Sequence, residues 1–283
     1  MDKGYCIWVV SPDGYEHSRA FDEIATGLRY AFRDIGCEAP VVRDVREIRG
    51  RPIILGCNLI PRLCGVRIPE GAVMYNLEQI QPSSPWMTED YIGLLRSFEV
   101  WDYSRRNMAR LRRLGVCNMK FCGIGYVPEL TRIPESEKDI DILLYGSVNE
   151  RRYKILKELD ELGFKVKVLF NFYGEARDRY IARSKIILNV HYYEAKVFEM
   201  VRVSYLLANR KFVVSETGDD PELERPFREG VVFARYENIV DECARYLREE
   251  AARDEIAERG FSGIRAFPQS RFLREALGDM KGI

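Results

Sequence analysis

Short apolar runs alternate along the chain with stretches in which apolar residues recur every three or four positions. The first run, YCIWVV at 5–10, ends at the turn sequence SPDG, and apolar residues at helical spacing then cover 21–35. Further strand-like runs lie at 52–56, 72–77 and 99–104, and the last leads into the basic helical sequence RRNMARLRRLG. Strands that alternate with helices predict an α/β fold with parallel sheets.

This pattern lapses at 123–138, where GIGYVPELTRIPESEK contains two prolines and shows no periodicity. We interpret this stretch as a linker between an N-terminal α/β domain over 1–125 and a C-terminal α/β domain over 139–268. The second domain repeats the alternation. Its expected strands lie at 141–146, 165–170, 185–190, 211–216 and 231–236, and its expected helices at 150–162, 195–208 and 237–260. A last helix is expected near 270–279.

The composition of the 283 residues is typical of a globular protein, with 46% hydrophobic and 31% charged residues. Lys plus Arg (44) equals Asp plus Glu (44), which argues against nucleic acid as the main partner. No apolar stretch is long enough to span a membrane, and the run after MDKG is too short for a signal peptide. We therefore expect a cytoplasmic protein.

Metal-binding patterns are weak. The seven cysteines form no CxxC pair, and two histidines are too few for a local zinc site: Cys6, Cys37, Cys57, Cys64, Cys117, Cys122 and Cys243. Asp139 and Asp141 spell the DxD sequence of metal-dependent sugar transferases, but they precede the strand at 141–146 instead of following it. We interpret this match as accidental and expect neither a required metal ion nor a cofactor.

The first candidate for chemistry is DILLYGSVNERR, a strand that ends at Gly146 and Ser147 and leads into a helix. A small-residue turn lets a ligand approach the backbone, and the free N–H groups of the helix start can bind phosphate. Arg151 and Arg152 add positive charge beside them. Such turns are common and paired arginines often only solvate a surface, so this motif taken alone favours a structural interpretation.

The second candidate is KIILNVHYYEAKVFEMVRVSYLLANRKFVVSE, in which polar and aromatic residues follow a strand. Glu199 could accept both hydroxyl groups of a ribose, as acidic residues do in other α/β nucleotide-binding folds. The alternative is a surface ion pair between Glu199 and Arg202, which would contribute little. Apolar neighbours on both sides of Glu199 favour a functional carboxylate. The turn before it supplies three further candidates for donor binding: His191, Tyr193 and Glu194.

The run from Asp141 to Glu216 resembles the donor-binding domain of GT-B glycosyltransferases, in particular the bacterial family-one and family-four-like groups. Their pattern is a strand ending in G-S or G-R and, later, a helix reading F/L-E-A-x-A-x-G before a V-V-S/T strand. Here VFEMVRVSYLLANRKFVVSE carries Phe198 and Glu199 at the F-E position and Asn209 where glycine is usual. The resemblance implies that Glu199 holds the ribose and that Arg151 or Arg152 contacts the phosphates.

The same resemblance implies two Rossmann-like domains that face each other across a cleft, with residues 269–283 crossing back to the N-terminal domain. One departure matters. Family-four-like enzymes carry a glutamate eight positions before the ribose glutamate, and this chain has His191 there. The retaining mechanism of that group therefore does not carry over.

More faintly, EHSRAFDEIATGLRYAFRDIG resembles the first loop and helix of GT-B acceptor domains, where a histidine or acid often follows the first strand. His17 lies in that loop and could serve as general base; a helix-capping or surface histidine is the alternative. If His17 has no such role, Asp22, Glu23 or Glu78 is the next candidate. The sequence YNLEQIQPSSPW offers Glu78 and Gln79 as groups that contact an acceptor.

We therefore expect a metal-independent glycosyltransferase, hexosyltransferase-like, that moves a sugar from a nucleotide-diphosphate sugar to a glycan, protein or small-molecule acceptor. The catalytic candidates are His17 and Glu78. Two alternatives stay open at this point. One is a nucleotide-sugar epimerase or phosphorylase, and the other is a non-catalytic GT-B scaffold that binds a nucleotide or glycan.

Overall fold

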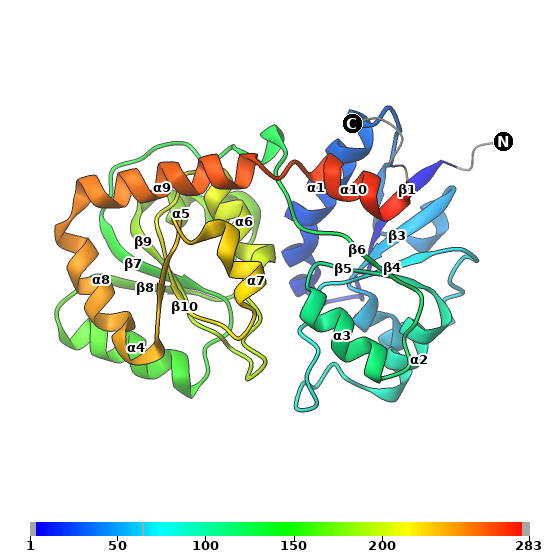
Figure 1. The fold of residues 1–283 in the computed structure, drawn as a ribbon, viewed down its shortest axis with the longest axis horizontal. Helices are drawn as coiled ribbons and strands as arrows, with labels where there is room; N and C mark the ends of the chain where they lie inside the picture. The colour runs from blue at the N-terminus through cyan, green and yellow to red at the C-terminus, as the bar shows by residue number, and fades with distance from the viewer. Residues whose placement is uncertain (1–3, 64, 279–283) are drawn as a thin grey trace. The chain divides into compact units, whose positions relative to one another are not determined.

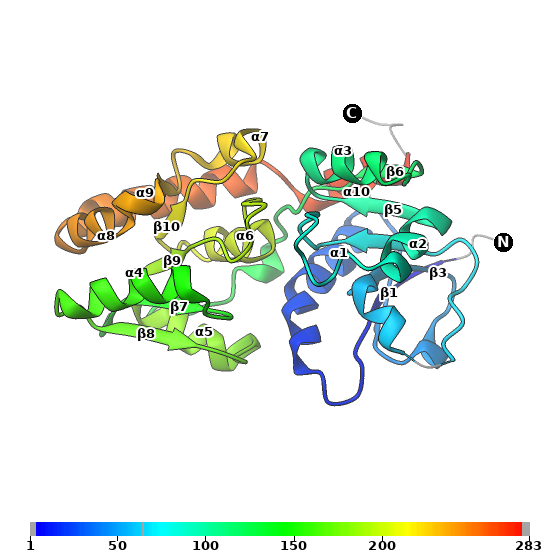
Figure 2. The ribbon, with the colours of Figure 1, turned by 90° about the horizontal axis from the view of Figure 1, so that it is seen from below.

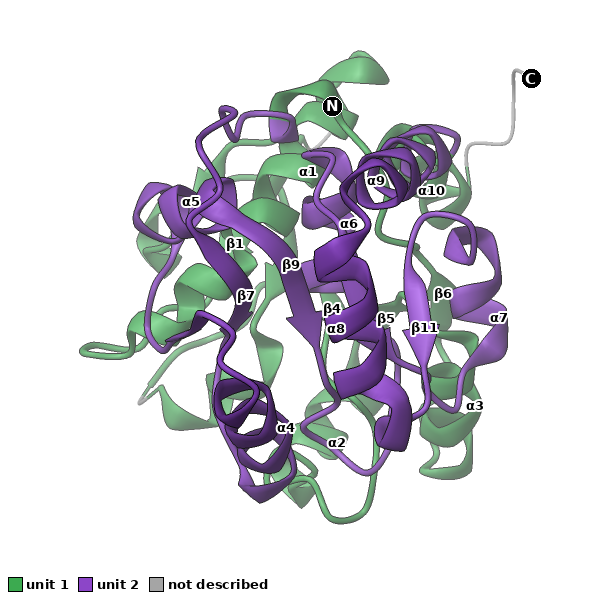
Figure 3. Cartoon of the chain, turned by 90° about the vertical axis from the view of Figure 1, so that its left-hand side faces the viewer, with its two compact units in different colours: residues 1–129, 267–283 green, residues 130–266 purple. Residues whose placement is uncertain are grey.

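The computed structural model describes residues 4–63 and 65–278, so Cys64 lies outside the described residues. The chain forms two compact units (Figure 3). Unit 1 comprises Met1–Glu129 and Phe267–Ile283, and unit 2 comprises Leu130–Ala266. No helix among the described residues is long and apolar enough to cross a membrane.

Unit 1 contains a parallel sheet of six strands in the order β2-β1-β3-β4-β5-β6. The strands expected at 5–10, 52–56, 72–77 and 99–104 are confirmed, whereas β2, β6 and α2 were not predicted. The strands are β1 (Tyr5–Val9), β2 (Val41–Val42), β3 (Arg51–Leu55), β4 (Val73–Asn76), β5 (Glu99–Asp102) and β6 (Met119–Phe121). The helices are α1 (Asp22–Asp34), α2 (Glu89–Ser97), α3 (Arg105–Arg113) and α10 (Gln269–Leu277).

Helices cover both faces of this sheet (Figure 1), with α1 and α10 on one side and α2 and α3 on the other. Successive side chains of a strand point to opposite faces, so a strand buried on both faces must be apolar throughout. Trp8 and Ile54 pack on the α2 and α3 side, and their chain neighbours Ile7 and Ile53 are equally buried. This double burial explains why the strands of unit 1 read as continuous apolar runs.

Unit 2 contains a parallel sheet of five strands in the order β11-β10-β9-β7-β8. All five expected strands are confirmed, while α5 and α7 were not predicted. The strands are β7 (Ile140–Tyr145), β8 (Val166–Leu169), β9 (Ser184–Asn189), β10 (Val213–Glu216) and β11 (Val232–Ala234). The helices are α4 (Glu150–Glu161), α5 (Gly174–Arg183), α6 (Met200–Ala208), α7 (Pro221–Glu224), α8 (Ile239–Arg248) and α9 (Glu250–Arg265).

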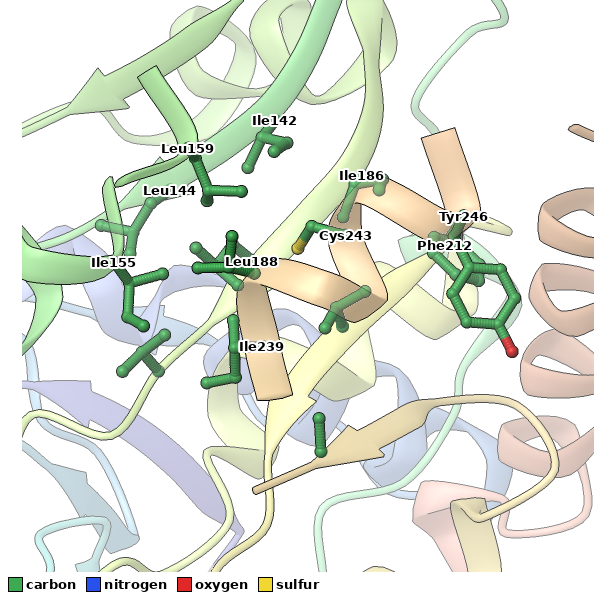
Figure 4. Packing of buried hydrophobic residues seen from close by; sticks show 14 of the residues in the cluster. Ile142, Leu144, Ile155, Leu159, Ile186, Leu188, Phe212, Ile239, Cys243 and Tyr246 are labelled. Carbon is green, nitrogen blue, oxygen red and sulfur yellow. The ribbon is translucent and has the colours of Figure 1, made fainter. Parts of the chain in front are cut away.

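The core of unit 2 lies between its sheet and the helices α4, α8 and α9 (Figure 4). Leu144 and Leu188 of the sheet pack there with Ile155 of α4 and Ile239 of α8. Figure 2 shows α8 and α5 on opposite sides of the strands, so unit 2 is also three layers thick. The carboxyl ends of its strands are thereby fixed by a dry core, which gives the loops beyond them a rigid base.

The helix expected over 195–208 begins at Met200, which corrects the sequence interpretation. Contacts with distant parts of the chain hold the residues before Met200 in a non-helical conformation. Lys196 has φ 44°, and its carbonyl accepts the N–H of Asp219 at 2.9 Å. Glu199 is the N-cap residue, with its carboxylate bound to groups at the end of β9. The apolar spacing of this stretch therefore reports burial in a loop and not a helix.

The DxD sequence lies at the amino end of β7, as expected. Asp139 pairs with Arg183, and Asp141 accepts from Lys185 Nζ at 2.7 Å and from Lys165 N–H at 2.9 Å. Both aspartates therefore have structural partners, away from the carboxyl ends of the strands where parallel sheets bind ligands.

The C-terminal segment of unit 1 is held by the stretch that follows β6. Tyr126 N–H donates to Phe267 O at 2.8 Å, and the buried Gln269 side chain accepts from Gly125 N–H at 2.7 Å. A Cβ on Gly125 would lie 2.4 Å from Phe267 O and 2.9 Å from Gln269 N. Only glycine permits this backbone approach.

We predict that Gly125→Ala lowers the free energy of unfolding by about 1–3 kcal/mol, because both clashing atoms belong to backbone that cannot move away freely. Urea unfolding at constant pH measures the change. Gly93→Ala is the matched control: Gly93 lies inside α2 with nothing within 4 Å of the added methyl group, so the same substitution there should stabilise. Equal effects of the two variants would contradict the close approach.

Candidate functional site

The candidate site of unit 2 lies where its strand order changes direction. From β7 the chain passes to β8 on one side of β7, and then to β9 on the other side. In open parallel sheets, ligands bind beyond the carboxyl ends of the two strands at such a point. Gly146 follows β7 here, and Asn189 ends β9. The geometry therefore places both sequence motifs at one edge of one sheet.

Two arginines converge on Gly146. Gly146 has φ 114°, and a Cβ there would lie 2.9 Å from Arg202 Nη2 and 3.7 Å from Arg152 Nη1. Arg152 is 3% exposed and donates to two carbonyls, Val190 O at 2.8 Å and Ser147 O at 2.7 Å. These contacts fix the Arg152 guanidinium beside Gly146, which has no side chain of its own.

Neither guanidinium group forms a direct ion pair with a carboxylate of the described residues, although Glu199 acts on both electrostatically. Within residues 4–63 and 65–278, neither Arg152 nor Arg202 has a carboxylate oxygen within ion-pair distance. Burial, and then the charge of Arg202, lower the pKa of Arg152 to about 10. Two like charges held together at a strand end are costly unless an anion binds between them. The pair is therefore suited to a phosphate or diphosphate group.

Arg151 has a different environment. Its guanidinium pairs with both carboxylate oxygens of Glu216, at 2.9 and 2.7 Å, and lies 4.2 Å above the ring of Tyr236. The sequence leaves open whether Arg151 or Arg152 contacts phosphate. The geometry favours Arg152, because the bidentate pair already uses the charge of Arg151.

Glu216 connects the loops of the site. Glu216 is the last residue of β10, and its side chain is 1% exposed. Besides Arg151 it accepts from the N–H of His191 at 3.1 Å and lies 3.3 Å from Lys196 Nζ. Burial would raise the pKa of Glu216, but the hydrogen bond from Arg151 and the neighbouring cationic groups lower it below its ordinary value. One ionised carboxylate thus holds the start of α4 and the loop after β9.

Glu199 is held at the same edge by two groups from the end of β9. His191 Nδ1 lies 3.0 Å from Glu199 Oε1, and Asn189 Nδ2 donates to Oε2 at 2.9 Å. Burial opposes ionisation, but the charge and hydrogen bond of His191, with Arg202 and Asn189, lower the pKa of Glu199. Arg202 donates to Asn189 Oδ1 at 3.1 Å. Glu199 is therefore a fixed, partly buried carboxylate and not one half of a surface ion pair.

His191 is buried in this network, at 1% exposure. Burial disfavours its charged form, yet the charge and hydrogen bond of Glu199, followed by the charges of Glu216 and Glu224, raise its pKa. Its other nitrogen, Nε2, has no hydrogen-bond partner within the described residues and lies 3.0 Å from where a Cβ on Gly218 would be. His191 thus orients Glu199 and leaves one polar atom available.

The remaining donor-side candidates lie in the same loops. Ser147 is exposed and contributes its carbonyl to Arg152. Tyr193 stacks edge-on against Tyr192, with ring centroids 5.0 Å apart, and Glu194 is exposed. The loops are further joined by Asn149 Nδ2, which donates to Tyr192 O at 3.0 Å. The structure therefore brings all eight donor-side candidates to one edge of the sheet of unit 2.

Unit 1 has its own cluster at the corresponding edge, and it contains both catalytic candidates. His17 lies in the turn between β1 and α1, with its ring centroid 5.2 Å from that of Tyr15. Arg62, after β3, lies 5.7 Å from the Tyr15 ring and 4.6 Å from the Trp86 ring. Glu78 follows β4 and acts electrostatically on Tyr15. Aromatic faces beside charged groups suit a sugar or another polar acceptor.

Glu78 is the perturbed acid of this cluster. Burial raises the pKa of Glu78 to about 7. Its Oε1 accepts from Asn58 Nδ2 at 3.1 Å, and its carbonyl accepts from Asn76 Nδ2 and Asn107 Nδ2, both at 3.0 Å. Asn76 in turn donates to the buried Asp102 at 2.6 Å. A carboxyl group that titrates near neutral pH on a fixed loop is suited to act as general base.

A comparison with known protein families identifies the family to which the chain belongs. A family model described as glycosyl transferase-like matches residues 130–275. The chain belongs to this glycosyl transferase-like family. The match includes every donor-side candidate described above, so the glycosyl transferase-like region and the candidate nucleotide edge coincide along the sequence.

Two relatives and one solved structure illustrate the likeness. Uncharacterized protein L138 of Acanthamoeba polyphaga mimivirus is 31% identical over 114 residues, which are 39% of this chain and 13% of that protein. Uncharacterized protein L140 of the same virus is 27% identical over 185 residues, 62% of this chain and 59% of that protein. This glycosyl transferase-like chain thus spans only part of both relatives.

HepE of Anabaena, solved in complex with UDP-glucose, superposes with a TM-score of 0.61 at 10% identity, covering 99% of this chain and 100% of that one. The likeness shows the fold, which is that of GT-B glycosyltransferases: α/β, with two parallel sheets flanked by helices.

Sequence reasoning missed three residues on which the site of this glycosyl transferase-like chain depends: Asn189, Arg202 and Glu216. From the sequence, Arg202 is only a possible surface partner of Glu199. Glu216 stands directly at the end of an apolar strand, VVSE, and a charged residue at that position was a usable signal. Asn189 ends the preceding strand in the same way.

We predict that Glu216→Ala lowers the free energy of unfolding by about 1–3 kcal/mol, because it leaves the N–H of His191 and the guanidinium of Arg151 without their acceptor. Urea unfolding measures the loss. Glu158→Ala, at an exposed position of α4, removes the same group and should change stability by about 0.5 kcal/mol or less. Similar losses in both variants would show that Glu216 does not hold the loops.

Proposed function

We propose that this protein is a glycosyltransferase that binds the nucleotide-diphosphate part of a sugar donor at the carboxyl edge of the unit 2 sheet. One observation carries the proposal: Arg152 and Arg202 converge without carboxylate partners on Gly146, beside the ionised Glu199. Paired cations next to a fixed carboxylate match a ligand that carries phosphates at one end and sugar hydroxyls at the other. A nucleoside diphosphate has this distribution of charge.

The assignment within the site follows from the contacts. Arg152 and Arg202, with the start of α4, would bind the diphosphate, because guanidinium groups and helix N-termini both stabilise phosphate oxygens. Glu199 would accept hydrogen bonds from the ribose hydroxyls. His191 and Asn189 would hold the Glu199 carboxylate in place while its remaining lone pairs meet the ligand.

Family membership and the neighbour's ligand support this assignment. The glycosyl transferase-like match spans residues 130–275, and HepE was solved with UDP-glucose. We extend to this chain the class of donor to which UDP-glucose belongs, a sugar carried by a nucleoside diphosphate. The transfer itself would need no metal ion, since the two arginines can neutralise the leaving diphosphate.

The acceptor would bind at unit 1. We propose Glu78 as the general base that removes the proton of the attacking hydroxyl group, because its pKa of about 7 keeps the carboxylate both available and basic at neutral pH. His17 is the second candidate, one aromatic ring away through Tyr15.

The first prediction concerns Glu199. Glu199→Gln removes the charge of the ribose-binding group and should weaken nucleotide affinity by roughly tenfold or more, because charge-assisted hydrogen bonds are lost. Isothermal titration with UDP and GDP measures the affinities. Glu222→Gln, at an exposed position of α7, is the control and should bind as the unaltered protein does. Unchanged affinity in Glu199→Gln would remove Glu199 from the donor site.

The second prediction concerns Glu78. Glu78→Gln should lower kcat by about 10²–10⁴ while nucleotide affinity stays unchanged, because a general base acts only on the chemical step. In the unaltered protein, kcat should rise with pH through about 7, where the Glu78 carboxyl group loses its proton. That ionisation should be absent from the Glu78→Gln profile.

Product analysis in the same assay separates the alternatives. Released nucleotide with a glycosylated acceptor supports transfer, an isomerised donor indicates an epimerase, and binding without turnover indicates a scaffold. His17→Ala provides the comparison for the base. If His17→Ala, and not Glu78→Gln, loses the rate and the ionisation near pH 7, the general base is His17.

A further inference from the structure

Unit 2 contains a cavity of about 440 Å³ at the opposite edge of its sheet from the donor-side loops. Ser184, which begins β9, and Phe212, which precedes β10, line it, so it lies at the amino ends of these strands. Its other walls come from the segment 131–138 and from α9. The proposed reaction uses none of these residues.

The floor of the cavity carries a buried cation, Lys211. This residue is 6% exposed and lies two positions after Asn209, the C-cap residue of α6. Among the described residues, its ammonium has neither a hydrogen-bond acceptor nor an ion-pair partner. Most of the Lys211 side chain is buried, yet its ammonium still reaches the cavity, so an anion in the cavity can bind it directly.

The other charged groups facing the cavity are either engaged or exposed. Lys185 pairs with Asp141 at 2.7 Å, Arg210 pairs with Glu258 at 2.9 Å, and Arg253 donates to backbone carbonyls including Leu247 O at 3.2 Å. The remaining acids, all exposed at the rim, are Glu135, Glu250 and Asp254. The unpaired acids of the lining are therefore exposed, whereas Lys211 is a buried residue whose ammonium forms no ion pair among the described residues.

A second lysine, which is exposed, adds to the positive potential of the cavity. Lys138 lines the same cavity and donates to Ala182 O at 2.6 Å. Burial, and then the charge of Lys138, lower the pKa of Lys211 to about 8, while Glu135 opposes this effect. At neutral pH most Lys211 side chains are thus still charged, at a cost that a bound anion would remove.

The wall opposite Lys211 is rigid. Asn209 accepts the N–H groups of Arg132 and Ile133 at 2.8 Å each and donates to Leu130 O at 2.8 Å. These bonds hold the segment 130–133 against the end of α6. The cavity is therefore built into the fold of unit 2 and does not depend on a loose loop.

We propose that this cavity binds the phosphate group of a small phosphate monoester, with the Lys211 ammonium as its principal ligand, at a site separate from the nucleotide donor. Its volume exceeds that of a bare oxyanion and lies within the range of small-molecule sites. Ser136 also lines it and can bind the polar remainder of such a molecule, whereas the hydroxyl groups of Thr131 and Ser184 already donate to backbone carbonyls.

The test uses a readout local to Lys211, because sulfate and phosphate could also bind at Arg152 and Arg202. A short pulse of acetic anhydride acetylates accessible amines, and mass spectrometry reports each lysine separately. Sulfate, phosphate and glycerol 3-phosphate should each lower the acetylation rate of Lys211 and leave that of the exposed Lys157 unchanged. Glycerol 3-phosphate should protect at lower concentration than phosphate.

Protection by sulfate should fall as pH rises through about 8, because Lys211 loses its proton there while sulfate keeps its charge. Lys211→Met removes the ammonium at similar length and should weaken glycerol 3-phosphate binding, measured by calorimetry, roughly tenfold or more. Lys157→Met makes the same change of net charge on exposed α4 and should have no effect.

Two results would overturn the proposal: no protection of Lys211 by any of the three anions, or equal protection of Lys157. Protection by glycerol 3-phosphate no better than by phosphate would reject the monoester. UDP affinity should be the same in Lys211→Met and in the unaltered protein, so that failure of this site and failure of the donor site are distinguishable.

Discussion

The ionised carboxylate of Glu216 is the interaction on which the candidate donor site depends. It stands buried at the end of β10 and is compensated by the bidentate guanidinium of Arg151, by Lys196 and by the backbone N–H of His191. A buried charge of this kind requires several partners at once. Because those partners belong to the start of α4 and to the loop after β9, satisfying one carboxylate fixes both segments relative to the sheet.

In the resulting arrangement, some charged side chains pair with one another and others remain available to a ligand. Arg151 and Arg152 are adjacent in sequence, yet the first is neutralised by Glu216 and the second points with Arg202 at Gly146. The same separation occurs at the other edge of the sheet, where Lys185 is paired with Asp141 and, among the described residues, Lys211 is not paired. A chain with zero formal net charge can therefore present two local cationic sites, because its charges are compensated unevenly.

Two departures from the GT-B pattern are accommodated by specific contacts. Asn209, in place of the usual glycine, uses its side-chain oxygen and nitrogen to bind the segment 130–133. His191, in place of a glutamate, reaches Glu199 and supplies the partner that keeps this carboxylate ionised. Both are substitutions of one polar function for another that change what the position contacts, and at His191 the buried Nε2 has no hydrogen-bond partner among the described residues.

The apolar runs of the sequence determined the central strands, because both faces of these strands are covered by helices and their residues are buried. The strand–Gly–helix turn at Gly146 marked one part of the proposed donor site. Sequence could not determine the start of α6, since apolar residues 197 and 198 are buried in a loop and mimic helical spacing. Nor could it tell Arg151 from Arg152, foresee the roles of Asn189 and Arg202, or single out Lys211. These depend on which charges the folded chain brings within hydrogen-bonding distance, and that is decided by contacts between residues distant in sequence.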